Sequence, residues 1–427
     1  MSNVFYTSLS GMRAASSGLN NVSNNVANMK TNGFKRQDVF FSEVANQNNG
    51  FDGLGSHTGH GVMEDSSGIR FAAGQMQKTG NNLDIAIDGN GFFVLKKDGQ
   101  IFYTRDGEFD FNSDGILVDK HSGAHVQKLD VNGNLADISM LDQTTYPGKA
   151  TTNIDLSGKL YAVEDKEAEG DDKKKVYKSV TQTVTFYDQQ GVEKKLTITL
   201  KPEEDLVPMP GTDPHTWKIE KLTVDGKDYL PDFGHDTISF NSMTGQPDVD
   251  DDISFIYGPN DKTAQKITLN FGKANSSDGV TQVDTSMDPS PDKDSKVEIK
   301  KDDGYGVGKL VGYSFNEKGQ LVYQYSNAQS KTDDKLALAN FRDLNVLNQV
   351  DGNMFTSSDN STRQLGAAGD NGFGRAQGGS VELSNVDVSV EFADIIVYQR
   401  MFQACSQVMQ IDKQMLETLY GGSSGKS

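Results

Sequence analysis

Residues 12–29, MRAASSGLNNVSNNVANM, carry the pattern that decides the fold at the start of this chain. The apolar side chains recur at alternating intervals of three and four residues, which is the heptad pattern of a helix that packs along one seam against another helix. The seam residues are Met12, Ala15, Leu19, Val22, Val26 and Met29. Most other positions hold Ser, Asn, Gly and Ala, and each Gly, such as Gly11 and Gly18, lowers helix stability by about 1 kcal/mol. We therefore expect a marginal helix that stops near Asn32-Gly33 and needs a partner to hold it.

The other end of the chain predicts a second, longer helix. No Pro or Gly occurs from Val386 to Tyr420, and Ser384 and Asp387 have capping-box spacing. We expect Gly421-Gly422 to end the helix. Two apolar seams run along this segment. One contains Val397, Met401, Ala404, Val408, Ile411 and Met415, and the other contains Ile395, Phe402, Met409 and Leu416.

A helix that is apolar on two seams is covered on two sides. The N-terminal helix can cover one side, and the second side then needs neighbours, which we expect to be other copies of the chain. At 1.5 Å per residue the C-terminal helix would be about 50 Å long. The simpler alternative is that both helices join one ordinary core, which is the usual fate of an apolar stripe. The polar N-terminal helix and the second seam count against that alternative.

The middle of the chain has the pattern of an all-β protein. Around residues 81–135, short apolar stretches alternate with tight-turn dipeptides such as Asp98-Gly99 and Asp106-Gly107. Similar patterning returns at 305–325, and residues 148–302 between them have a different, acidic and Pro-containing composition. The segment order predicts nested all-β domains on a base of terminal helices that form a coiled coil.

The predicted divisions follow this nesting. We expect a terminal helical domain from 1–33 with 384–427, a connecting segment at 34–80, a first β domain from 81–147 with 303–383, and an inserted outer β domain at 148–302. The fold class is therefore mainly β with terminal α-helices.

Charge and composition narrow the choice of partners and compartments. The net charge of −19 disfavours nucleic acid and anionic lipid as main partners, because both would repel the surface. The only cysteine, Cys405, leaves no internal disulfide possible. The N-terminus lacks the basic and apolar regions of a cleavable signal peptide, and no stretch approaches the roughly 20 apolar residues of a membrane span. The chain is thus expected in the cytoplasm, or exported by a route that leaves no cleavable signal.

We find no motif for catalysis, a cofactor or a metal. Residues 110–115 match the first half of an EF-hand loop, but the twelfth position is His121 instead of Glu, so a turn is the better interpretation. His121 and His125 are four residues apart without the Glu of a zinc protease, and His57 and His60 show no third ligand. Cys405 lies among apolar neighbours, where an inert thiol is the default. We therefore predict no enzymatic activity, no cofactor and no metal site.

Three groups of motifs resemble one known family. The N-terminal group is Ser8-Leu9-Ser10-Gly11-Met12, residues 20–28 (NNVSNNVAN) and Thr31-Asn32-Gly33-Phe34-Lys35-Arg36. The second group is residues 83–93 (LDIAIDGNGFF) with Tyr103-Thr104-Arg105-Asp106-Gly107, and the third is residues 384–389 (SNVDVS) with Glu391-Phe392 and Gln399-Arg400. Together they resemble the bacterial flagellar rod, hook and hook-associated proteins, in the right order and framing nearly the whole chain.

The length and the large insert are most similar to the family members that build the hook, the curved joint between motor and filament. The resemblance implies a structural subunit that self-assembles into a flexible tube and transmits torque from rod to filament. It implies contacts with other copies, with rod, hook-cap and hook–filament junction proteins, and with the flagellar type III export apparatus, and it implies an extracellular location reached without signal cleavage. Phe5 and Leu9 resemble the short hydrophobic export signal of such proteins, although ordinary helix packing also explains them.

Two departures from the family pattern bear on the inner contacts. Met401-Phe402 and Ala404-Cys405 stand where the family often has an aromatic residue and an Asn, and residues 421–427 form a Gly/Ser-rich end instead of an apolar one. Two alternatives stay open: a distal rod or hook-associated protein of the same family, and a secreted β-rich protein that binds or hydrolyses carbohydrate.

Overall fold

The computed structural model describes residues 3–44, 61–130, 132–165, 177–203, 215–229, 236–250, 252–258, 264–283, 294–350, 353–370 and 372–423. Its elements are mainly β-strands between two terminal α-helices, which confirms the predicted fold class. The chain forms two compact units. The first contains Met1–Gln143, Gly312–Gln324 and Ser330–Ser427, and the second contains Thr144–Val311 and Tyr325–Gln329. Among the described residues, none of the helices has the length and apolar character needed to cross a membrane.

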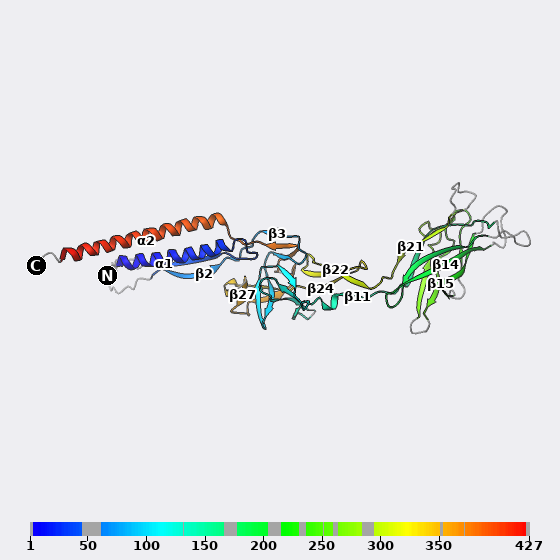
Figure 1. The fold of residues 1–427 in the computed structure, drawn as a ribbon, viewed down its shortest axis with the longest axis horizontal. Helices are drawn as coiled ribbons and strands as arrows, with labels where there is room; N and C mark the ends of the chain where they lie inside the picture. Colours follow the sequence, from blue (N-terminus) through cyan, green and yellow to red (C-terminus); the bar gives the residue numbers. More distant parts are fainter. Residues whose placement is uncertain are drawn as a thin grey trace, which may run out of the picture. The chain divides into compact units, whose positions relative to one another are not determined.

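The two terminal segments form α1 (Asn3–Ala27) and α2 (Val388–Ser423). α2 thus continues through Gly421-Gly422, where its end was predicted. They lie side by side and antiparallel within the first unit (Figure 1). Asp387 caps α2, because its carboxylate accepts hydrogen bonds from the backbone N–H groups of Ser389 at 2.8 Å and Val390 at 3.5 Å. Such a cap satisfies N–H groups that the first helical turn leaves free. α1 ends at Ala27, one turn before the predicted stop at Asn32-Gly33. The chain then turns at Gly33, whose φ of 69° favours glycine.

The strands of the first unit are short and mostly antiparallel. They are β1 (Gln37–Glu43), β2 (Val62–Ile69), β3 (Met76–Lys78), β4 (Ile85–Asp88), β5 (Phe92–Lys97), β6 (Gln100–Thr104), β7 (Phe109–Phe111), β8 (Leu117–Asp119), β9 (His125–Leu129), β10 (Leu135–Asp137), β24 (Ser330–Lys335), β25 (Leu338–Phe341), β26 (Leu347–Val350), β27 (Met354–Ser357), β28 (Arg363–Gly366), β29 (Arg375–Gly378) and β30 (Ser380–Glu382). Short 3₁₀ turns occur at Leu141–Gln143 and Leu344–Val346. β22 (Gly308–Phe315) and β23 (Gln320–Tyr325) each cross a boundary between the two units along the chain.

The largest sheet of the first unit follows the order β26-β27-β6-β5-β9-β8-β7, with β10 beside β9 and β25 between β5 and β28. The predicted turn at Asp98-Gly99 closes the β5–β6 hairpin, with φ values of 50° and 79° and with Lys97 opposite Gln100. Positive φ at both central residues is what a two-residue hairpin turn requires. Edge-to-face aromatic pairs fill one side of the sheet, including Phe92 with Phe355 and Tyr103 with Phe341.

The second unit has its own core. Its strands are β11 (Thr145–Tyr146), β12 (Asn153–Tyr161), β13 (Val180–Tyr187), β14 (Glu193–Glu203), β15 (Thr216–Val224), β16 (Lys227–Tyr229), β17 (Thr237–Ser239), β18 (Asp252–Tyr257), β19 (Gln265–Asn270), β20 (Val280–Val283) and β21 (Lys296–Asp302). Most of them form two sheets of five strands, one built around β12 and the other in the order β13-β14-β15-β16 with β17 beside β15. Trp217 is fully buried in this core, and its indole N–H donates to Gln282 Oε1 at 3.2 Å.

Candidate assembly surface

The contact between α1 and α2 follows a heptad on α2, but not one of the predicted apolar seams. Glu391, Tyr398 and Cys405 of α2 contact α1. Asp412 continues their spacing of seven and is also buried, and we call these four residues the inner seam. Glu391 Oε2 accepts a hydrogen bond from Asn25 Nδ2 at 3.2 Å. A Cβ atom built on Gly18 would lie 2.6 Å from the Tyr398 ring, and one on Gly11 would lie 2.7 Å from Cys405 Sγ.

Gly11 and Gly18 therefore have a packing role that the sequence interpretation missed. They were expected only to weaken α1, whereas in the structure each accepts a side chain of α2. The spacing of these residues could have revealed the role. Gly11 and Gly18 are seven residues apart on α1, and Tyr398 and Cys405 are seven residues apart on α2. Close approach of two helices at small residues is the reason such glycines are tolerated inside a helix.

A polar network fixes one end of the inner seam. Arg36 Nε forms an ion pair with Glu391 Oε1 at 2.7 Å, and its terminal nitrogen pairs with Asp394 Oδ2 at 3.1 Å. Asn25 also binds the backbone of Gln37 through both side-chain atoms, at 2.9 and 3.0 Å. Burial raises the pKa of Glu391 above its ordinary value, while the Asn25 hydrogen bond and the Arg36 charge act in the opposite direction. Within this network, the hydrogen bond between Asn25 and Glu391 joins α1 directly to α2.

The predicted apolar residues of α2 lie in two strips that flank the inner seam. At 100° of rotation per residue, the inner seam lies between the two predicted apolar seams. α1 therefore covers the inner seam and neither of the predicted seams. Ile395, Met401 and Met409 are half-buried, whereas the rest are exposed. The exposed members are Val397, Phe402, Ala404, Val408, Ile411, Met415 and Leu416.

On α1 the predicted seam is more deeply covered. Ala15 and Val22 are buried, and Leu9, Met12, Leu19 and Val26 are half-buried. The predicted export-signal residue Phe5 is exposed, and so is Met29, which lies beyond the end of α1 and therefore does not extend its seam.

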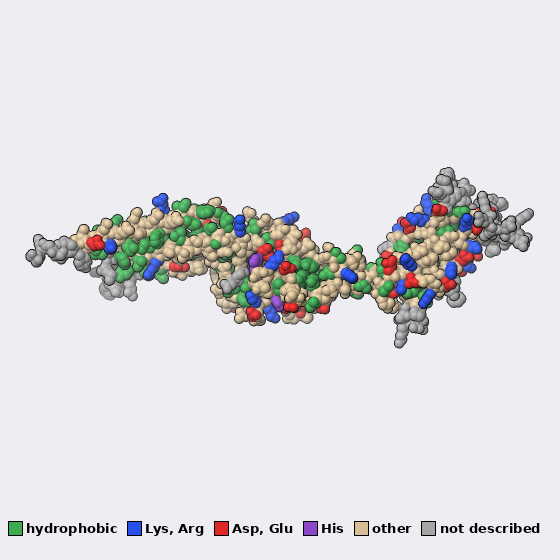
Figure 2. Space-filling view, in the orientation of Figure 1, with side chains coloured by type: hydrophobic (Ala, Val, Ile, Leu, Met, Phe, Trp, Pro, Cys, Tyr) green, Lys and Arg blue, Asp and Glu red, His purple; other side chains and the backbone are tan. Residues whose placement is uncertain are grey.

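The sequence interpretation missed part of the exposed apolar surface. Val390, Phe392 and Ile396 in the first turns of α2 are also exposed. Figure 2 shows hydrophobic side chains gathered along the helix pair. Contiguous apolar surface of this kind is typical of a contact site and unusual for the surface of an isolated protein.

A buried cluster connects the helix pair to the β-strands of the same unit. Glu382, at the end of β30, pairs with Lys35 and, at 3.1 Å, with Arg105, and all three side chains are buried. Burial lowers the pKa of Lys35, and the Glu382 charge opposes that shift. Lys35 and Arg105 belong to two of the motif groups that resemble the flagellar family, and Asn385 of the third binds the backbone of Arg36 nearby. Residues far apart in the sequence thus converge at the base of the helices.

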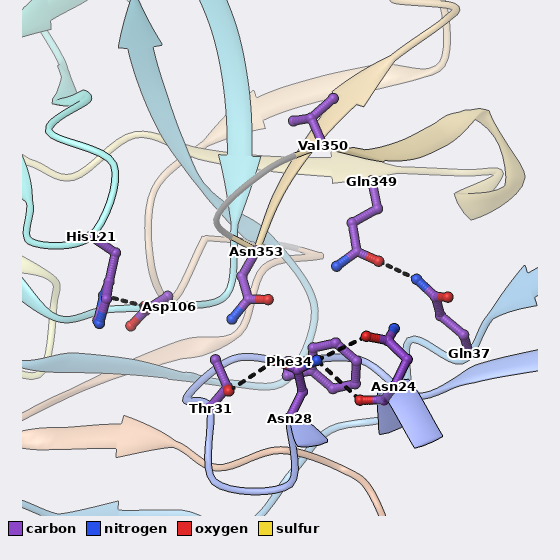
Figure 3. A pocket seen from close by; sticks show the side chains of 10 residues that line it. All are labelled: Asn24, Asn28, Thr31, Phe34, Gln37, Asp106, His121, Gln349, Val350 and Asn353. Carbon is purple, nitrogen blue, oxygen red and sulfur yellow. Dashed lines mark hydrogen bonds and ion pairs between the residues drawn. The ribbon is translucent and has the colours of Figure 1, made fainter. Parts of the chain in front are cut away.

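A pocket of about 590 Å³ opens beside this base (Figure 3). It is lined by Asn24, Asn28, Thr31, Phe34, Gln37, Asp106, His121, Gln349, Val350 and Asn353. His121 Nδ1 lies 3.1 Å from Asp106 Oδ2. Burial, and next the charge of Asp119, raise the pKa of Asp106 from 3.8 to about 7.

The other sites considered from sequence have structural explanations. Residues 110–115 span the end of β7 and the turn that leads to β8, in which Asn112 Oδ1 accepts hydrogen bonds from the backbone N–H groups of Asp114 and Ile116. His125 pairs with Asp137 at 3.0 Å, so His121 and His125 have different partners. His57 and His60 lie outside the described residues. Cys405 is a half-buried free thiol.

Three family models match separate parts of the chain. Residues 5–35 match the model described as flagella basal body rod protein. Residues 86–162 match the flagellar hook protein FlgE/F/G D1 domain, and residues 377–421 match the C-terminal region of the flagellar basal body rod FlgEFG proteins.

Curated relatives are similar over nearly the whole chain. The flagellar hook protein FlgE of Salmonella typhimurium is 28% identical, and that of Treponema pallidum is 29% identical. Each alignment covers 97% of this chain and 98% of the relative. Among solved structures, the Helicobacter pylori flagellar hook protein FlgE2 aligns at 13% identity with a TM-score of 0.42, over 70% of this chain and 99% of that one.

Proposed function

The chain belongs to the flagellar hook protein family, and from that premise we propose how its surfaces serve the hook. It is a structural subunit of the bacterial flagellar hook that polymerises with copies of itself. The full-length relatives are hook proteins, which favours the hook over the distal rod and over a carbohydrate-binding protein.

The observation that carries the mechanism is the exposure of the apolar strips on α2. The side chain of Val397 is 60% exposed and that of Ile411 is 55% exposed, although both lie on a helix already paired with α1. Burying such side chains is worth about 1.5–3 kcal/mol each. Contact with further helices would therefore stabilise an assembly strongly, and a second copy of this chain offers helices of matching shape.

We propose that the predicted interface residues act in two ways. Ala15, Val22 and their half-buried neighbours on α1 hold the helix pair together, and the exposed residues of α2 contact neighbouring subunits. Helix pairs from many subunits would then form an inner tube that carries torque, with the β domains outside it. Polar faces on those β domains would let them slide as the tube bends, more easily than apolar faces would.

The four predicted divisions remain part of this proposal. They assign residues 1–33 and 384–427 to the inner tube, residues 34–80 to a connection, residues 81–147 and 303–383 to a first outer domain, and residues 148–302 to a second. Export would occur through the flagellar type III apparatus without signal cleavage, with Phe5 and Leu9 as the recognised hydrophobic residues. The rod, the hook cap and the hook–filament junction proteins would be the further partners.

Removal of the helices tests the assembly mechanism. We expect the full chain to form curved tubes visible by electron microscopy, and a chain lacking residues 1–30 and 386–427 to stay unassembled in the same buffer. Curved tubes from the trimmed chain would refute the mechanism.

A gene deletion separates hook from rod. Cells without the gene should keep complete rods and lack hooks, whereas cells that lack the distal rod as well would assign the protein to the rod.

A further inference from the structure

Three chemistry-bearing side chains meet in the first unit although no sequence motif joins them. Asp106 follows β6, Asp119 is the last residue of β8, and His121 lies two residues later. Their ligating atoms all lie within 4.8 Å of one another. Figure 3 shows His121 and Asp106 turned toward each other at one side of the pocket.

The two carboxylates are buried without a strong base beside them. Asp106 is 3% exposed and Asp119 is 2% exposed. Among the described residues, neither forms a salt bridge with Lys or Arg, and His121 is the only basic group paired with Asp106. Asp119 Oδ2 accepts hydrogen bonds from Ser122 N at 2.7 Å and Ser122 Oγ at 2.5 Å, whereas its Oδ1 accepts none from the described part of the chain. Buried carboxylates are normally paired with a cation or coordinate a metal.

We propose that Asp106, Asp119 and His121 bind one divalent transition-metal cation. A mixed set of imidazole and carboxylate ligands suits Zn²⁺ or Mn²⁺ better than Ca²⁺ or Mg²⁺, which prefer oxygen ligands alone. The charge of +2 neutralises the two adjacent carboxylates. The pocket of about 590 Å³ gives the ion an entry path and room for water at the positions that the protein leaves open.

Such an ion would link two loops near the base of the helices. Asp106 belongs to the loop between β6 and β7, Asp119 ends β8, and His121 belongs to the turn between β8 and β9. Asn24 of α1 lines the same pocket. The bound ion would therefore stiffen the region where the helix pair meets the strands, independently of whether the chain polymerises.

Calorimetric titration of the chelator-treated full chain with ZnCl₂ or MnCl₂ tests the site. We expect one saturable site for at least one of the two metals and a higher melting temperature when it is bound. Asp119→Asn and His121→Gln should each weaken binding about tenfold or more, since the first removes a carboxylate charge and the second removes the imidazole. His121 is exposed, so His121→Gln keeps the test valid even if Asp119→Asn impairs folding.

His125→Gln is the matched control, because His125 also pairs with an aspartate but lies outside the cluster. It should bind metal as the unmodified chain does. The proposal fails if neither metal binds saturably, or if the affinity is unchanged in both Asp119→Asn and His121→Gln.

Discussion

The inner seam of α2 and the strips beside it have opposite compositions. The inner seam buries Glu391 and Asp412, with exposures of 0% and 3%, while the flanking strips leave Val397 and Ile411 more than half exposed. In an isolated pair of helices the apolar residues would lie inside and the acidic residues outside. The contrast indicates that the contact within the chain depends on close approach and polar pairing. The apolar surface stays exposed, and in our proposal it contacts neighbouring subunits.

The polar character of the inner seam has a physical advantage for such a subunit. Apolar side chains can slide past one another by a helical turn at little cost, whereas Asn25 and Glu391 are satisfied in one register only. Single polar pairs in helix interfaces are known to fix register in this way. We infer that the in-chain contact sets geometry and that the flanking strips supply most of the association energy.

The largest effect is expected from charges in the apolar strip. The double variant Val397→Asp, Ile411→Asp should abolish tubes under conditions where the unmodified chain assembles, because each buried carboxylate would cost several kcal/mol. The helix signal of the monomer should persist, since both positions are exposed. Sedimentation and electron microscopy measure assembly, and circular dichroism measures the helices.

The matched control places the same charges elsewhere on α2. Gln407 and Gln414 are exposed and lie about half a turn from the inner seam, away from both strips. Gln407→Asp with Gln414→Asp should still assemble. If this control also stops assembly, or if the Val397, Ile411 variant forms tubes, the distinction between the strips and the rest of α2 is wrong.

The sequence predicted those parts of the fold that depend on local patterns. The 3.6-residue period located both helices, and Asp98-Gly99 predicted a hairpin because two positive φ values in succession need such residues. The inner seam was not predictable in this way. Gly11, Gly18 and Cys405 are small, and Glu391 is charged, so none adds to an apolar period, and their role depends on which residues α1 places opposite them.

Contacts between segments far apart in the chain were the other feature that the sequence did not predict. Asp106, Asp119 and His121 meet because the β6–β7 loop and the β8–β9 turn converge, and no local spacing specifies that convergence. In the second unit, β12 pairs in parallel with β19 and β20, and parallel pairing joins segments too distant for a turn signal to reveal.

An intermediate effect is expected from Gly18→Ala, which tests the close approach in the inner seam. Helix propensity alone would stabilise α1 by about 1 kcal/mol. The new Cβ would instead collide with the Tyr398 ring, and overpacking costs about 1–3 kcal/mol. We expect net destabilisation, seen as a lower urea midpoint of the helical circular dichroism signal.

Two further variants identify the cause of that loss. Ser16→Ala, at an exposed position of α1, should stabilise the helix by a few tenths of a kcal/mol. Combining Gly18→Ala with Tyr398→Ala should cost less than the sum of the single changes, because the collision is absent. Stabilisation by Gly18→Ala alone would mean that the helices do not approach closely there.

The smallest effect concerns pH and the buried carboxylate of the inner seam. Burial raises the pKa of Glu391 in the native state, and the nearby Asp394 and Asp38 act in the same direction against Asn25 and Arg36. Above the ordinary Glu value of 4.5, the native state therefore holds this proton more tightly than the unfolded chain, so this group's contribution to stability falls as pH rises to the native pKa. The Glu391→Gln variant has no titrating proton at this position, so the stability of the variant relative to the unmodified chain should increase over that pH interval and then level off.

Urea unfolding of both chains from pH 4 upward measures this difference in stability, with Glu417→Gln at an exposed site of α2 as the control. A difference that decreases with pH would show that the ion pair with Arg36 outweighs the cost of burial, and the inner seam would then be held by charge attraction more than by shape.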